Sequence, residues 1–134
     1  MKLCLAQIAH ARSGDKGDIA DLSLFAWEPT GYSILAQHVT VDALRQHFSH
    51  LWPASKQANA TSEYAHPIER YELPKLLALK FVLHGALNGG ATSSLRSDNL
   101  AKTIGAQLLE MEIDIPDDEA VTVLQATQQA IAVF

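Results

Sequence analysis

The stretch KLCLAQIAHARSGDKGDIADLSLFAW, residues 2–27, holds two apolar segments separated by a short polar one. Lys2–His10 is apolar at nearly every position, which predicts a strand covered on both faces. Arg12–Asp18 contains two glycines and no hydrophobic residue, so it is predicted as a loop or tight turn. Ile19–Trp27 has apolar residues at alternate positions and predicts a second strand. The fold is therefore expected to begin with two strands joined by a charged turn.

Two short helices are predicted to follow the second strand. Pro29 suits the first position of a helix that reaches Ala36, because its fixed φ and missing N–H fit there. Thr40 is the predicted N-cap of Val41–His50, in which apolar residues recur at helical spacing. Residues 52–65 are small and polar, and they are predicted to form a mobile loop.

The second half of the chain predicts strands and helices without strict alternation. Ile68–Leu73 is a predicted short strand. Lys75–Asn88 follows Pro74 and is predicted as a helix, with a buried strand as the alternative because it is apolar on most sides. A helix that is capped by Asp98 and reaches Met111, and a strand over Glu112–Ile115, are predicted to follow. The predicted fold class is therefore α+β, a small sheet covered by helices.

Composition limits the classes of function. The 134 residues are 48% hydrophobic, carry a net charge of −5 and suit a single domain. Residues 110–134 hold six acids and no base, whereas residues 1–109 hold ten bases and nine acids. The acidic balance argues against a nucleic-acid binder, and the lack of a long apolar run argues against a membrane span. One cysteine, Cys4, suits a reducing compartment, so we expect a cytoplasmic protein.

The polar segment between the first two strands is the first candidate site. The two glycines of Arg12–Asp18 let the backbone turn and expose N–H groups, as anion-binding concavities require. Arg12 and Lys16 add cations, and Ser13 adds a hydroxyl. The alternative is a charged hairpin turn whose side chains are simply solvated.

Two further segments combine charged residues with hydroxyls or aromatic rings. On the predicted strand Glu69–Leu73, Arg70 and Glu72 share one face, while Glu69 and Tyr71 share the other. The stretch 88–98 holds two glycines, four hydroxyl side chains and Arg96 before a predicted helix, which suits a phosphate or carboxylate. The alternatives are a surface ion pair in the first case and a simple connector in the second.

The sequence gives little indication of a metal site or of a nucleophilic catalytic residue. Of six histidines, only His47 and His50 lie at a spacing that could share a helix face, and no HExxH motif occurs. Cys4 has no companion thiol, and no GxSxG motif marks a nucleophilic serine. His84 lies in an apolar run and is predicted to be a hydrogen-bonded core residue. We therefore expect no metal and no cofactor.

Taken in order, the three polar segments resemble one family. Arg12–Asp18 with its apolar strand, RYELPKLLALKFVLHGALNGG (70–90) and SLRSDNLAKTIGAQLLEMEI (94–113) are similar to the C-terminal domain of the acyclic terpene utilisation protein AtuA. The resemblance covers about residues 3–113 and leaves 114–134 as an acidic extension of the single domain. It implies a ferredoxin-like fold, a compact sheet with helices packed mainly on one face. It also implies a setting in the catabolism of branched terpenoid acids as CoA thioesters.

The residues and the resemblance together give one candidate anion-binding set. Its members are Arg12, Ser13, Gly14, Asp15, Lys16, Gly17, Arg70, Glu72, Gly89, Gly90, Ser94, Arg96 and Lys102. Among them, Arg12, Lys16, Arg96 and Lys102 are expected to line a pocket at strand and helix ends. The chain departs from the family pattern at Asp18, Asn88 and Ala101, where the family has Asn, Gly and Gly.

Three functions stay open. The first is a small subunit or accessory module that binds an anionic metabolite, a CoA thioester or carboxylate, or a larger AtuA-type domain or subunit. The second is a non-catalytic homo-oligomeric assembly domain, with the charged residues as a structural salt-bridge network. The third is a lyase or hydratase that uses Glu72, Tyr71 and Lys16 as acid and base. No catalytic residue is assigned.

Overall fold

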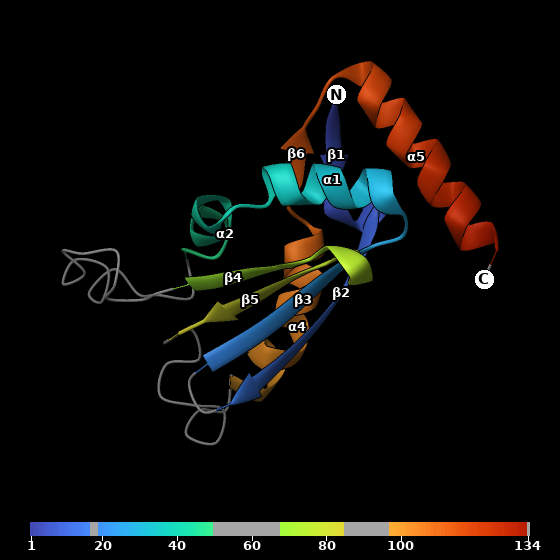
Figure 1. Ribbon diagram of the computed structural model, residues 1–134. Helices are drawn as coiled ribbons and strands as arrows, with labels where there is room; N and C mark the ends of the chain where they lie inside the picture. Colours follow the sequence, from blue (N-terminus) through green and yellow to red (C-terminus); the bar gives the residue numbers. More distant parts are fainter. Residues whose placement is uncertain (17–18, 50–67, 85–96, 134) are drawn as a thin grey trace.

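The computed structural model describes residues 1–16, 19–49, 68–84 and 97–133, with side chains in the last range from Thr103 onward (Figure 1). Its main feature is an antiparallel sheet whose strands are, in spatial order, β2 (Ala9–Lys16), β3 (Ile19–Ala26), β5 (Ala78–Leu83) and β4 (Ile68–Leu73). Two further strands, β1 (Lys2–Cys4) and β6 (Glu112–Asp114), pair with each other in a separate small sheet.

Three of the described helices, at residues 29, 41 and 97, begin close to the predicted positions. The helix bounds are α1 Pro29–His38, α2 Val41–His47, α4 Ser97–Leu109 and α5 Asp117–Ala132. The Glu28 carboxylate accepts the N–H groups of the first turn of α1, and the Thr40 hydroxyl caps α2 as predicted, accepting the Ala43 N–H at 3.1 Å. Asp98 lies inside the first turn of α4 instead of before it. None of the described helices is long and apolar enough to cross a membrane.

One face of the main sheet forms the core. Along β3, alternate residues from Ala20 to Ala26 are buried, and Leu79, Phe81 and Leu83 of β5 lie beside them. Helix α4 packs against β2 and β3, α1 contacts β3 and β5, and α2 contacts β4 (Figure 1). The predicted α+β class, with helices mainly on one face, is confirmed.

The predicted strand Lys2–His10 is wrong in its middle. A 3-10 turn at Leu5–Gln7 divides it into β1 and β2. Leu5 is fully buried, and its N–H donates to the Met111 carbonyl at 2.9 Å. This contact draws the chain into the core, so β1 pairs with β6 and β2 pairs with β3.

The predicted loop at Arg12–Asp18 is wrong for residues 12–16. These residues continue β2, and each pairs with a residue of β3, from Arg12 opposite Ser23 to Lys16 opposite Ile19. Cross-strand hydrogen bonds outweigh the weak strand preference of Gly and Asp in this segment. The hairpin connection is therefore much shorter than the sequence predicts.

The predicted helix at Lys75–Asn88 is also wrong over its described part. A 3-10 turn at Pro74–Leu76 leads into the strand β5, and Leu77 adopts a left-handed conformation with φ 54°. That conformation reverses the chain, so β5 inserts between β3 and β4. A central strand explains the apolar run, and the strand alternative is correct for residues 78–83. The predicted mobile loop at 52–65 lies outside the described residues.

Candidate functional site

The face of the main sheet away from the core carries two of the charged candidates, Arg12 and Lys16. We call it the open face, because its side chains are half-buried or exposed and the described helices pack on the other side. Strand alternation assigns to it His10, Arg12, Gly14 and Lys16 of β2, Ile19, Asp21, Ser23 and Phe25 of β3, Lys80 and Val82 of β5, and Glu69, Tyr71 and Leu73 of β4.

Cross-strand pairing arranges these side chains in rows across the sheet. In the order β2, β3, β5, β4, one row is Arg12, Ser23, Lys80 and Tyr71, and the next is Gly14, Asp21, Val82 and Glu69. A row crosses three strand spacings of about 4.8 Å, roughly 14 Å in all. Arg12 and Lys16 thus lie at one edge of the open face and Glu69 lies at the opposite edge.

The β2 edge carries two cations, one on each side of Gly14, whose lack of a side chain leaves space between them. Arg12 and Lys16 are exposed, and no ion pair joins either of them to another side chain in the described ranges. Gly14 lies between them, and a Cβ added there would meet no atom within 4 Å. Its φ is outside the left-handed range, so the backbone does not require glycine. Glycine inside a strand often marks a place where an outside group approaches closely.

An ion pair occupies the middle of the open face. Lys80 Nζ lies 3.3 Å from Asp21 Oδ2, and both side chains are about half exposed. Such a pair contributes little stability in water. Asp21 Oδ1 is buried and accepts no hydrogen bond from the described residues. Asp21 also pairs across the strands with Gly14, so this acceptor lies in the same row as the space over Gly14.

At the β4 edge, Glu69 accepts hydrogen bonds from two side chains. The Tyr71 hydroxyl donates a short bond to Oε1, and His84 Nε2 lies 2.6 Å from Oε2. The bond from Tyr71, and then that from His84, lowers the pKa of Glu69, and the same Tyr71–Glu69 bond raises the pKa of Tyr71. At neutral pH the carboxyl is therefore ionised and the phenol protonated.

The sequence anticipated only part of this cluster. Glu69 and Tyr71 share a face as predicted, and His84 is hydrogen-bonded as predicted. However, His84 is half-buried beside the open face, with 34% of its side chain exposed, so its placement in the core is wrong. The pairing with Glu69 joins residues 15 positions apart across the β4–β5 hairpin, which no local pattern reveals.

Arg70 and Glu72 point away from the open face. Arg70 pairs with Phe81 on the core side, and 19% of its side chain is exposed. Its Nε donates to the Val39 carbonyl at 3.1 Å, one Nη to the Ala36 carbonyl at 2.6 Å and the other to Glu72 at 2.9 Å. These carbonyls end α1, where a cation also complements the helix dipole. Arg70 therefore fastens α1 to β4 within the chain.

Ser13 is likewise engaged inside the fold. Its Oγ accepts the backbone N–H of Gly105 in α4 at 3.1 Å, and a Cβ on Gly105 would meet that oxygen at 3.2 Å. Asp15 shares the side of Ser13 and is exposed, and Lys102 lies about one turn before Gly105 in α4. The remaining candidates, Gly17, Gly89, Gly90, Ser94 and Arg96, lie outside the described residues.

An aromatic group flanks the cations on β2. His10 stacks on Phe25 with ring centroids 5.1 Å apart and also contacts Trp27 at 4.7 Å. Burial lowers the pKa of His10 below its ordinary value of 6.5. The fold thus favours the neutral imidazole.

This shift predicts a loss of stability in weak acid. The unfolded chain protonates His10 near pH 6.5, whereas the folded chain resists protonation, so unfolding becomes easier as the pH falls below that value. We expect the thermal midpoint, followed by circular dichroism, to fall between pH 7 and pH 5. The His10→Phe protein keeps a stacked ring that cannot be protonated, so its thermal midpoint should fall less than that of the parent over the same pH range. Equal losses in both proteins would contradict this assignment.

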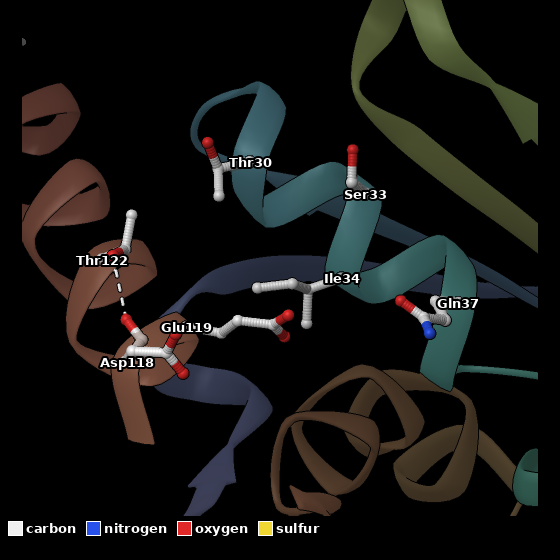
Figure 2. A pocket seen from close by; sticks show the side chains of 7 residues that line it. All are labelled: Thr30, Ser33, Ile34, Gln37, Asp118, Glu119 and Thr122. Carbon is white, nitrogen blue, oxygen red and sulfur yellow. Dashed lines mark hydrogen bonds between the residues drawn. The ribbon is translucent and has the colours of Figure 1, made fainter. Parts of the chain in front are cut away.

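A separate groove lies between α1 and α5. Its volume is about 290 Å³, and Figure 2 shows its lining, which consists of Thr30, Ser33, Ile34, Gln37, Asp118, Glu119 and Thr122. The Thr122 hydroxyl donates to the Asp118 carbonyl at 2.9 Å. Two carboxylates and no cation line this groove, so it does not suit an anion. None of the predicted site residues lies in it.

Comparisons with known proteins place the chain in a family. Within the described ranges no group of three or more His, Cys, Asp or Glu residues is arranged to hold a metal ion. No curated protein and no solved structure matches the chain at a significant level. The model of the AtuA ferredoxin-like domain matches residues 3–114, which include the main sheet, α4 and the β1–β6 pair. The chain therefore belongs to the AtuA ferredoxin-like domain family.

Proposed function

We propose that the chain is a small subunit or accessory module of an AtuA-type system of branched organic-acid metabolism, and that its open face binds an anionic metabolite. The family is linked to acyclic terpene utilisation, which supports this setting. One observation carries the binding proposal: Arg12 and Lys16 have no ion-pair partner in the described chain and flank the side-chain-free Gly14.

The spacing of the two cations favours an extended anion. Arg12 and Lys16 are four residues apart on one strand, so their Cα atoms are separated by about 13 Å. Both side chains are long enough to lean over Gly14. A guanidinium binds carboxylate or phosphate oxygens in pairs, and an ammonium acts as a point charge. A ligand with several anionic oxygens, such as a CoA thioester, fits this spacing better than a small single ion.

Calorimetric titration tests this function. The probes are coenzyme A, a short branched acyl-CoA thioester and the matching free carboxylate, each added to the full chain. Loss of one exposed charge-assisted contact corresponds to about 1–2 kcal/mol, so Arg12→Ala and Lys16→Ala should each weaken the best ligand about five- to thirtyfold. Lys75→Ala removes an exposed lysine elsewhere and should bind like the parent. Unchanged affinity in the Arg12→Ala/Lys16→Ala protein would contradict the proposal.

A second candidate function is an assembly domain without a ligand. It is favoured by Arg70, whose guanidinium is engaged within the chain by Glu72 and two carbonyls. An acid–base role for Glu72, Tyr71 and Lys16 has less support. Glu72 and Tyr71 point to opposite faces of β4, and Lys16 lies at the far edge of the sheet.

A further inference from the structure

Charge changes sign across the open face. Arg12 and Lys16 lie at the β2 edge, the neutral pair of Lys80 and Asp21 lies in the middle, and Glu69 lies at the β4 edge. The hydrogen bonds from Tyr71 and His84 keep Glu69 ionised and hold it at this edge. The face is therefore positive along one edge strand and negative along the other.

Two copies of this face are complementary in one orientation. A twofold axis that runs between the sheets, parallel to the strands, places β2 of each copy over β4 of the other. An axis perpendicular to the strands would place β2 over β2 and bring four cations together. Like charges at an interface cost affinity, so the first arrangement is favoured. Packed sheets lie about 10 Å apart with nearly aligned strands, within reach of these side chains.

From this complementarity we propose that a second copy of the chain packs on the open face and that its Glu69 carboxylate occupies the space over Gly14 between Arg12 and Lys16. Rotation about an axis parallel to the strands preserves position along them, and Gly14 and Glu69 belong to one row. In the dimer, the space over Gly14 of each copy therefore faces the Glu69 carboxylate of the other copy. The proposal goes beyond the proposed function, because it gives the same two cations a protein carboxylate as ligand.

The neighbouring rows fit the same arrangement. Arg12 of one copy faces Tyr71 of the other, where a guanidinium can lie against an aromatic ring. In the row beyond, on the same side of the charged contact, Phe25 lies opposite the small Ala78, because these two residues pair across β3 and β5. Face-to-face packing also covers Tyr71 and Leu73, which are 47% and 38% exposed in the single chain.

Charge reversal with rescue tests the interface. We expect the parent chain to be a dimer by sedimentation velocity at about 100 μM in low salt. Arg12→Glu and Glu69→Arg should each raise the dimer dissociation constant at least tenfold. The protein with both changes restores opposite charges between positions 12 and 69 at both contacts while Lys16 stays unchanged, so it should dimerise at least about threefold more tightly than either single variant. Lys75→Glu is the control away from the face, and circular dichroism verifies that each variant is folded.

Two outcomes would overturn the dimer. One is a monomeric parent chain at this concentration, and the other is a double variant that associates no better than the single ones. A monomeric chain that still binds coenzyme A through Arg12 would refute the interface and leave the proposed function intact. A dimer rescued by charge reversal, with no anion bound by the Glu69→Gln protein, would refute the proposed function and support the interface. If the anion site and the dimer interface are both correct, coenzyme A should dissociate the dimer, because it competes with Glu69 for the same cations.

Discussion

Replacing Arg70 with alanine should lower the free energy of unfolding by about 2–4 kcal/mol, because two carbonyls and a carboxylate lose their buried cationic donor. The carbonyls of Ala36 and Val39 end α1, and the guanidinium that binds them is 19% exposed. Without it, these part-buried acceptors lose their charged donor. Urea unfolding followed by circular dichroism measures the change.

Two controls separate the packing role of Arg70 from a ligand-binding role. Glu72→Gln removes only a half-exposed carboxylate, so it should change stability by less than about 1 kcal/mol. Arg70→Lys keeps a charge but not the forked geometry, and it should recover only part of the loss. In the folded fraction, coenzyme A should bind Arg70→Lys as it binds the parent. A variant of unchanged stability that loses this binding would place Arg70 in the ligand site instead.

Replacing Gly14 with valine should have opposite effects on stability and on binding. Valine has a high strand preference, and the position has room for a side chain, so stability should stay equal or rise by up to about 1 kcal/mol. The new side chain fills the space between Arg12 and Lys16, however. Affinity for coenzyme A, or for the second copy, should therefore fall at least tenfold.

Gly14→Ala gives the graded control for this prediction. Its single methyl group should reduce affinity less than valine does, with stability again maintained. Calorimetry and urea unfolding on the same samples give both quantities. A Gly14→Val protein that binds normally would show that no outside group approaches this position. A protein that instead loses about 1 kcal/mol or more of stability would show that the glycine serves the fold itself.

Local signals in the sequence located the elements that depend on them. Pro29 and Thr40 mark the beginnings of α1 and α2 because their effects on φ and on the first N–H groups act within one helical turn. Residues 12–16 and 78–83 were assigned wrongly because their conformation depends on strands distant in sequence. Glycine and aspartate suggest a turn when no pairing partner is known, and an apolar run is compatible with either a helix or a central strand.

The residues of the candidate site also differ in whether a local pattern or a distant partner determines their role. Cations around a glycine form a local pattern, which predicts Arg12, Gly14 and Lys16 as one set, and the structure places all three on the same face of β2. Arg70 was assigned to the same site because its partners, the carbonyls of Ala36 and Val39, lie 34 and 31 positions away. Backbone acceptors leave no signature in a sequence, so a cation committed to them looks the same as one available to a ligand.

Amide chemical-shift mapping of the full chain during titration with coenzyme A tests the central claim most directly. An anion bound on the open face should cause saturable shifts that are largest along β2 at Arg12, Gly14 and Lys16 and extend to Asp21 on β3. The Arg12→Ala/Lys16→Ala protein should lose them, and Lys75→Ala should keep them. Shifts confined to the groove between α1 and α5, or shifts that persist without the two cations, would contradict an anion site on the open face.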